Sequence, residues 1–173
     1  MKHGYKEFAI IGAGRFGSSM AETLYDLGCE VLIIDKDEEL VEMVSSHVTH
    51  AIRADVTENG VLEQLGLHNF DVVVVAIGQD MQASVLITMM LKELGVPYII
   101  AKSQSDIHGR ILQRIGADKV VYPERDMGQL FRLGSGLPAR LHGDAPQKAA
   151  GRRRRAAVYP DAYRYRIPHA QAG

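Results

Sequence analysis

The sequence predicts an α/β fold, a doubly wound parallel sheet of six strands with helices on both faces. Apolar runs typical of strands alternate with segments of helical periodicity as far as about residue 122. A glycine-rich turn joins the first apolar run to the first helical segment, and an acidic residue ends the second apolar run. Continuous apolar runs such as Val72–Ile77 fit this class, because strands of a parallel sheet are buried on both faces.

The expected elements follow one another in strict alternation. The strands are predicted at residues 7–12, 30–35, 50–54, 71–77, 97–101 and 119–122. The helices are predicted at residues 15–27, 38–46, 58–65, 80–94 and 105–115. Thr57 and Ser105 are candidate N-caps, and Gly28, Gly66, Gly95 and Gly116 follow helices as C-terminal caps often do. The strand order expected of six strands and five crossovers is 3-2-1-4-5-6.

The first turn carries the spacing of a dinucleotide-binding fingerprint. Gly12, Gly14 and Gly17 form the pattern G-x-G-x-x-G between a strand and a helix, and Asp35 ends the next strand. In this pattern the first glycine permits a tight turn, the second lets the backbone approach a pyrophosphate, and the third lets the helix pack close to the strand. A carboxylate at Asp35 can accept both ribose hydroxyls and would repel a 2′-phosphate, which makes NADP an improbable ligand. The alternative is a degenerate domain that keeps the glycines for packing alone.

Composition limits the function classes. The net charge is −1, but residues 1–128 hold 11 Lys/Arg against 19 Asp/Glu, and residues 129–173 hold nine against two. The single cysteine, Cys29, excludes an intrachain disulfide and fits a reducing cytoplasm. The apolar run 72–77 is too short to span a bilayer, and residues 1–7 do not resemble a signal peptide. We expect no direct membrane insertion.

The pattern of strands and helices ends near Gly128. Residues 129–173 are rich in Ala, Gly, Pro and Arg, and they have no sustained period of 2 or 3.6. We expect a first domain at residues 1–128 and a basic, disordered tail at residues 129–173. The Arg152–Arg155 run is read as part of a solvated tail, so we expect no nucleic-acid partner.

Further motifs resemble the RCK N-terminal family, also called the KTN or TrkA-N family. These motifs are Gly14-Arg-Phe-Gly17, Ala54-Asp-Val-Thr57, Val75-Ala-Ile-Gly78, Ala101-Lys102 and the run from Ile115 to Gly128. The resemblance covers about residues 6–128. Within the family, the chain is similar to regulatory subunits of Ktr-type bacterial potassium transporters. It implies a cytoplasmic protein, held at the inner face of the cell membrane by its partner, that binds ATP, ADP or NAD(H) and gates a membrane potassium channel subunit.

The resemblance also implies a set of binding residues. It consists of Gly12, Ala13, Gly14, Arg15, Phe16, Gly17, Asp35, Lys36, Asp55, Val56, Thr57, Ala76, Ile77, Gly78, Lys102 and Glu124. In this set Asp55 and Thr57 border the adenine, and residues 76–78 line the nucleotide. Arg15 reaches the terminal phosphates, and Glu124 helps hold a divalent cation beside them. The alternative for Glu124 is a surface carboxylate paired with Arg125.

The chain departs from the family after Gly128, where Gly134, Gly136 and Pro138 interrupt the expected crossover helix. We therefore expect self-association as a dimer, with apolar surface from Met81, Leu86, Met89 and Met90, rather than a stable octameric ring. Two other readings stay open, a small NAD-dependent oxidoreductase and a truncated, nonfunctional RCK product. We expect no enzyme, because no acid–base pair is evident: Tyr98 precedes Lys102 by four residues, but across a strand.

Overall fold

The computed structural model describes residues 4–126, which form one six-stranded parallel sheet in the order β3-β2-β1-β4-β5-β6. Every neighbouring pair of strands is parallel, and the register places Ile11 beside Ile34 on one side and Val75 on the other. The predicted fold class and strand order are confirmed. The tail predicted at residues 129–173 lies outside the described residues.

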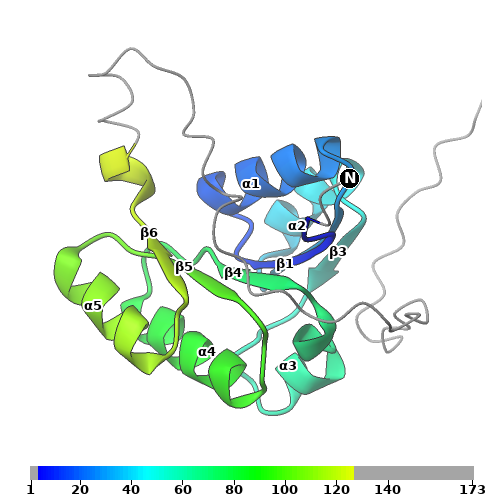
Figure 1. Ribbon diagram of the computed structural model, residues 1–173. Helices are drawn as coiled ribbons and strands as arrows, with labels where there is room; N and C mark the ends of the chain where they lie inside the picture. The colour runs from blue at the N-terminus through cyan, green and yellow to red at the C-terminus, as the bar shows by residue number, and fades with distance from the viewer. Residues whose placement is uncertain (1–3, 127–173) are drawn as a thin grey trace, which may run out of the picture.

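The strands and helices alternate along the chain as expected (Figure 1). The strands are β1 (Glu7–Ile11), β2 (Glu30–Asp35), β3 (His50–Arg53), β4 (Val72–Val75), β5 (Ile99–Lys102) and β6 (Lys119–Val121). The helices are α1 (Arg15–Asp26), α2 (Glu38–Val44), α3 (Val61–Gln64), α4 (Met81–Glu93) and α5 (Asp106–Ile115). Two short 3₁₀ helices, η1 (Ser45–His47) and η2 (Leu67–Asn69), follow α2 and α3.

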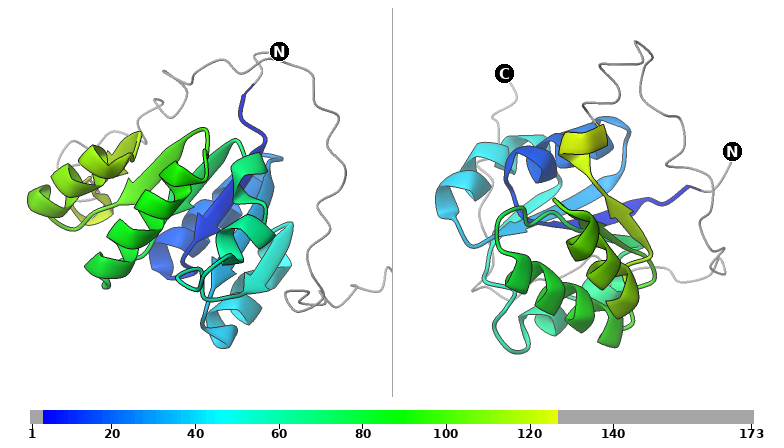
Figure 2. Two further views of the ribbon diagram at one scale, coloured as in Figure 1. Left: turned by 90° about the horizontal axis from the view of Figure 1, so that it is seen from below. Right: turned by 90° about the vertical axis from the view of Figure 1, so that its left-hand side faces the viewer.

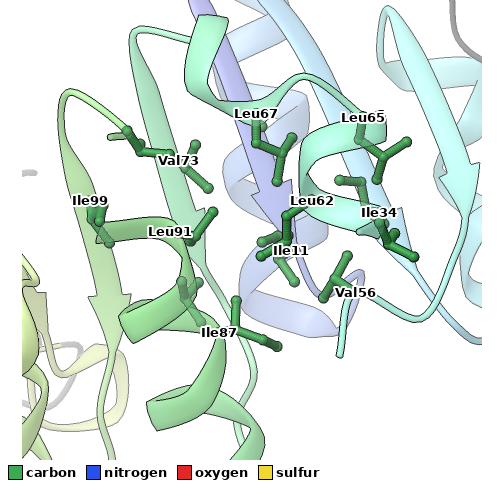
Figure 3. Packing of buried hydrophobic residues seen from close by; sticks show 14 of the residues in the cluster. Ile11, Ile34, Val56, Leu62, Leu65, Leu67, Val73, Ile87, Leu91 and Ile99 are labelled. Carbon is green, nitrogen blue, oxygen red and sulfur yellow. The ribbon is translucent and has the colours of Figure 1, made fainter. Parts of the chain in front are cut away.

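Helices cover both faces of the sheet. In the right-hand view of Figure 2, α1 and α2 lie above the sheet and α4 and α5 lie below it. Alternate strand residues point to opposite faces, so each strand contributes to two separate apolar clusters. The cluster beneath α3, α4 and α5 includes Ile11, Ile34, Leu62, Leu91 and Ile99 (Figure 3). The cluster beneath α1 and α2 is built around Ile10, Ile33, Val41 and Val74.

Most helix ends follow the predicted capping chemistry. The Ser105 hydroxyl accepts the His108 N–H and begins α5, as predicted, and Asp37 and Asp80 cap α2 and α4 in the same way. The predicted N-cap at Thr57 is wrong. Its hydroxyl donates instead to Asp55, and α3 begins four residues later, at Val61 after Gly60. Short hydroxyl side chains often close a local turn in place of a helix cap, and this accounts for the difference.

The arrangement of the strands places all their carboxyl ends together. Because all six strands are parallel, their carboxyl ends lie along the same edge of the sheet. The order reverses between β1 and β4, so the connections after these two strands run to opposite faces. In open α/β sheets, ligands bind outside the carboxyl edge at this point of reversal.

Candidate functional site

The turn between β1 and α1 is shaped by its glycines. Gly12 has a φ of 107°, and a methyl group there would approach the Ala76 carbonyl oxygen to 2.9 Å. A methyl group at Gly17 would overlap the Gly12 carbonyl oxygen, so α1 can pack this close to β1 only without a side chain at residue 17. Nothing lies within 4 Å of the position a methyl group would take at Gly14. The turn is therefore tight at its base and open at Gly14.

Asp35 is fixed against this turn. One carboxylate oxygen accepts the Ala13 N–H at 2.7 Å, and the other accepts the Asp37 N–H at 2.9 Å. The side chain is half-buried at the end of β2. An ionised carboxylate has about four lone-pair positions, so each oxygen retains capacity for a hydroxyl donor after these two bonds.

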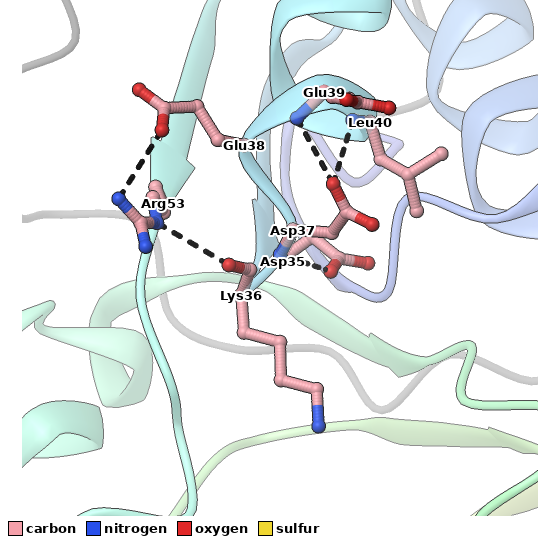
Figure 4. Close-up of polar contacts among 7 residues, drawn as sticks. All are labelled: Asp35, Lys36, Asp37, Glu38, Glu39, Leu40 and Arg53. Carbon is pink, nitrogen blue, oxygen red and sulfur yellow. Dashed lines mark hydrogen bonds and ion pairs between the residues drawn. The ribbon is translucent and has the colours of Figure 1, made fainter.

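The connection between β2 and α2 is fixed by the N-cap of α2 and by a side chain from β3 (Figure 4). The Asp37 carboxylate accepts the Glu39 N–H at 3.0 Å and begins α2. From the end of β3, the Arg53 Nε donates to the Lys36 carbonyl oxygen at 3.3 Å, and its guanidinium pairs with Glu38 at 3.3 Å. The Lys36 side chain extends away from these contacts in Figure 4.

The turn after β3 is closed by Asp55. Its carboxylate accepts both the N–H and the hydroxyl of Thr57. These two bonds, aided by the positive charge of Lys36, hold the pKa of Asp55 below its usual value despite partial burial. Val56 between them is buried in the core, so of these three residues Asp55 and Thr57 offer polar groups at the edge.

The Lys102 ammonium lies at the carboxyl ends of β4 and β5, next to the point where the strand order reverses. Ala76 is buried beside the first turn, and Ile77 and Gly78 continue outward from β4. The Lys102 ammonium, at the end of β5, lies 5.8 Å from the centre of the Phe16 ring. The same nitrogen lies 3.0 Å from the position a methyl group would take at Gly78. Residues from three segments therefore meet at this point.

Two further predicted residues lie at the rim. Arg15 is the first residue of α1 and is exposed. Glu124 is exposed in the short helical segment 123–126 that follows β6. The neighbouring Arg125 pairs with Asp106 at 2.9 Å and stacks on the Tyr122 ring at 4.0 Å, so its described partner is Asp106 rather than Glu124. Within residues 4–126, no group of three or more His, Cys, Asp or Glu side chains could hold a metal ion.

Sequence reasoning did not find the contacts of Arg53 with Glu38 or of Arg125 with Asp106. Each pair joins residues that are distant in the chain and lie on different elements. In the sequence, the only indication that these four residues share one edge is that each lies at or after the end of a predicted strand. The sequence did place Gly12, Gly14, Gly17 and Asp35 together, as the structure does.

A glycine-rich first turn, a fixed carboxylate at the end of β2 and a reversal of strand order are the features of a Rossmann-type fold. The family model of the TrkA-N domain matches residues 8–123. The chain belongs to the TrkA-N family, and the predicted family resemblance is confirmed.

The chain is similar to curated potassium uptake proteins. It is 51% identical over 124 residues to the Ktr system potassium uptake protein C of Bacillus subtilis, covering 72% of this chain and 56% of that protein. It is 49% identical over 123 residues to the Ktr system potassium uptake protein A of the same organism, covering 71% and 55%. The chain thus spans about half the length of these relatives. Their names describe potassium uptake, in agreement with the prediction that the chain is not an enzyme.

Solved structures share the fold. The NAD(P)-binding domain of an exopolyphosphatase-related protein from Archaeoglobus fulgidus superposes with a TM-score of 0.66 at 25% identity, covering 76% of this chain and 97% of that domain. GsuK bound to ADP gives a TM-score of 0.62 at 24% identity, covering 75% and 35%. The Kef C-terminal domain of Shewanella denitrificans in its AMP-bound form gives a TM-score of 0.59 at 21% identity, covering 74% of this chain and 82% of that one.

None of the helices in residues 4–126 has the length and apolar character that a membrane span needs.

Proposed function

We propose that residues 1–128 form a regulatory domain of a potassium uptake system that binds an adenine nucleotide at the carboxyl edge of its sheet. The observation that carries the proposal is the joint geometry of the first turn and Asp35. Gly14 leaves the backbone open to a phosphate, while the Ala13 N–H holds the Asp35 carboxylate beside the same turn. A ribose and its attached phosphates need these two features side by side.

The proposal orients the nucleotide along the edge. The ribose hydroxyls would bind Asp35, and the adenine would lie over the ends of β2 and β3, near Lys36, Asp55 and Thr57. The phosphates would cross the first turn at the N-terminus of α1, where main-chain N–H groups and the helix dipole favour anions. Ala76, Ile77 and Gly78 would border the nucleotide from β4.

ATP, ADP and NAD(H) are the proposed ligands. Other proteins with this fold have been solved with AMP, ADP or NAD bound. Arg15, exposed at the start of α1, would contact a terminal phosphate. Glu124 would help hold a divalent cation at the phosphates, which would themselves supply most of the cation's oxygen ligands.

The proposed output is control of a membrane potassium channel subunit at the inner face of the cell membrane. The potassium uptake names of the relatives support this role.

The domain would act as a dimer. Met81, Leu86 and Met89 lie on α4 with 52%, 39% and 40% of their surface exposed, and exposed apolar side chains that gather on one element are typical of a contact surface. Met90, the fourth residue predicted for this surface, is half-buried and packs against the core instead.

Titration calorimetry of the full chain with AMP, ADP, ATP, NAD and NADH tests the proposal. Wild-type protein should bind at least one of these nucleotides, and Gly14→Val should abolish the binding without unfolding the chain, because its side chain enters open space. Asp26→Asn is the control, since Asp26 ends α1 on the opposite edge of the sheet. Absence of binding to wild type, or equal binding to Gly14→Val, would contradict the proposal.

The oxidoreductase alternative is tested separately. Incubation with NADH or NAD and a panel of carbonyls and alcohols should give no protein-dependent turnover. Hydride transfer above background would overturn the regulatory interpretation. A truncated, nonfunctional product would instead bind no nucleotide in the calorimetry.

A further inference from the structure

The helix layer formed by α1 and α2 carries most of the negative charge of the domain. Residues 16–52, which include α2 and all but the first residue of α1, contain one Lys and no Arg against eight Asp and Glu. Their net charge of −7 accounts for nearly all of the −8 that residues 1–128 carry. Five exposed acidic side chains lie on the two helices themselves, at Glu22, Asp26, Glu38, Glu39 and Glu42. Of these, Glu38 pairs with Arg53.

Large apolar side chains are exposed in the same layer. Tyr25 and Leu27, at the end of α1, are 44% and 70% exposed, and Met43 on α2 is 75% exposed. Both helices begin at the carboxyl edge of the parallel sheet and run toward the opposite edge, so the ends that carry these side chains lie on the same side of the domain. The side chains of Glu22 on α1 and His47 on η1 approach to 3.9 Å between these two ends. Exposed apolar side chains gathered among charges are typical of a contact surface.

The charge of this surface limits what can cover it. We refer to the exposed side chains of α1 and α2 as the α1–α2 face. A second copy of the chain that docked symmetrically would set the same acidic side chains against one another, and this like-charge contact is unfavourable. Helices α4 and α5, by contrast, carry three basic and two acidic residues, so the layer proposed for dimerisation is nearly neutral. The α1–α2 face therefore fits a basic partner that also carries apolar or aromatic side chains.

The chain itself contains a segment of this chemistry. Residues 152–167 read Arg-Arg-Arg-Arg-Ala-Ala-Val-Tyr-Pro-Asp-Ala-Tyr-Arg-Tyr-Arg-Ile, with six Arg against one Asp, and with three Tyr. A guanidinium can bind a carboxylate with two parallel hydrogen bonds, and a tyrosine ring buries apolar surface while its hydroxyl stays polar. These residues lie outside the described part of the chain, and their sequence complements the α1–α2 face in both charge and apolar character.

The segment is also within reach of the face. Twenty-five residues separate Asp126, the last described residue, from Arg152. A flexible chain of this length spans about 25–30 Å on average, and a domain of this size has a radius of gyration of about 14 Å. Such a connection gives an effective concentration on the order of 1 mM, so a contact with a Kd of about 1 mM would already be populated in about half of the molecules.

From this complementarity we propose that residues 152–167 dock on the α1–α2 face of their own chain. Their arginines bind the carboxylates of the two helices, and their tyrosines cover Leu27 and Met43. The contact requires no helix or strand in the segment, but it replaces the sequence-based expectation that the Arg152–Arg155 run is only solvated. The inference is independent of the proposed nucleotide site, which lies at the carboxyl edge.

Paramagnetic NMR on the full-length protein tests the docking. A nitroxide label is attached to Ala157→Cys in a chain that also carries Cys29→Ser, so that the label has one site. The amide signals of α1 and α2 should broaden, and those of α4 and α5 should keep their widths. In 1 M salt, where the Debye length is about 3 Å, the broadening should largely disappear, because the proposed contact is mainly electrostatic.

Two charge-reversed variants of the labelled chain test the role of the acidic side chains. Asp26→Lys combined with Glu42→Lys places two cations on the α1–α2 face and should largely abolish the broadening. Glu63→Lys combined with Glu93→Lys is the matched control, because it changes the net charge by the same amount on α3 and α4, on the other side of the sheet. The broadening of α1 and α2 should persist in this control.

A second pair of variants tests the apolar part of the contact. Leu27→Ser should reduce the broadening without any change of charge. Ile107→Ser is its control, because Ile107 on α5 is exposed to the same extent, 68% against 70%, and lies in the opposite layer. Thermal unfolding of each variant shows whether the fold is intact.

The outcomes distinguish docking from its alternatives. The proposal is overturned if α1 and α2 do not broaden, if both helix layers broaden equally, or if the two charge-reversed variants behave alike. A mixture of labelled chains without ¹⁵N and unlabelled chains with ¹⁵N reports contacts between copies. Broadening of α1 and α2 as strong in this mixture as within one chain would place the segment on a second copy, and would also overturn the proposal.

Discussion

The carboxyl edge has two halves that differ in how their charges are satisfied. At the ends of β2 and β3, Asp35 accepts two main-chain N–H groups, Asp55 accepts two bonds from Thr57, and Arg53 pairs with Glu38. At the ends of β4 and β5, the ammonium of Lys102 faces an aromatic ring. The first half is fixed before any ligand binds, which suits recognition of neutral hydroxyls. In the second half, the described contact of the Lys102 ammonium is an aromatic ring and not a carboxylate.

The largest expected effect concerns the glycine contact on which both halves depend. Gly17→Ala would drive a methyl group into the Gly12 carbonyl, and Gly12 in turn packs on Ala76 of the β4 side. We expect a loss of about 3 kcal/mol or more in the free energy of unfolding, at or above the usual cost of overpacking. Gly14→Ala is the matched control, with open space around the new methyl group, and should change stability by less than about 1 kcal/mol. Urea unfolding of both variants measures the difference, and equal stability would contradict the close contact.

Asp35→Ala tests the fixed half of the edge. It removes the acceptor of the Ala13 and Asp37 N–H groups, so stability should fall by about 1–3 kcal/mol. AMP, ADP and NAD should all weaken about ten-fold or more, because each carries the adenosine ribose. Calorimetry with the three nucleotides decides, and a loss confined to one of them would contradict the assignment of Asp35 to the ribose.

His108 provides a pH test of the helix layer beneath β4 and β5. Burial lowers the pKa of His108 below its usual value, and its Nε2 has no hydrogen-bond partner among residues 4–126. The unfolded chain therefore binds a proton more readily than the folded one. The free energy of unfolding should fall as the pH drops through about 6.5, the pKa of an unperturbed histidine.

Replacing His108 with Leu should flatten this dependence between about pH 7.5 and pH 5, the range in which an unperturbed histidine takes up its proton. The control is His47→Gln, because His47 is exposed on η1. The measurement is the melting temperature as a function of pH. The same slope in wild type and His108→Leu would show that another group is responsible.

The smallest expected effect is that of Arg53→Ala. The Arg53–Glu38 pair is exposed on both sides, at 57% and 52%, so its loss should reduce the free energy of unfolding by less than about 1 kcal/mol. Thermal unfolding at low and high salt would detect the contribution, which should shrink as salt screens the pair. A loss that persists in high salt would show that the bond from Arg53 to the Lys36 carbonyl matters more than the ion pair.

Periodicity and turn chemistry predicted most of the fold. The predicted first helix, residues 15–27, corresponds to α1 (Arg15–Asp26), and the fourth, residues 80–94, to α4 (Met81–Glu93). The clearest error is the third helix, predicted at residues 58–65 and observed only at Val61–Gln64. Its first turn depends on whether the Thr57 hydroxyl caps a helix or bonds to Asp55, and local sequence does not separate these two options.

The candidate site was predictable where its parts are close in the chain. Gly12, Gly14 and Gly17 lie within six residues, and their spacing carries a known backbone geometry. The contact of Lys102 with Phe16 was not predictable in the same way, because 86 positions separate the two residues and only the strand order brings them together. The interaction of Arg125 with Asp106 depends likewise on β6 lying next to β5.

The contact between Gly12 and Gly17 is made by main-chain atoms alone. The spacing of β1 and α1 is therefore set by the dimensions of the peptide unit, which no substitution elsewhere can alter. Core residues such as Ile10 or Ala21 can vary in shape, and such changes would alter the stability of the fold rather than the width of the turn between β1 and α1. During evolution, the core residues of this domain can therefore be substituted while the geometry of the turn between β1 and α1 stays the same.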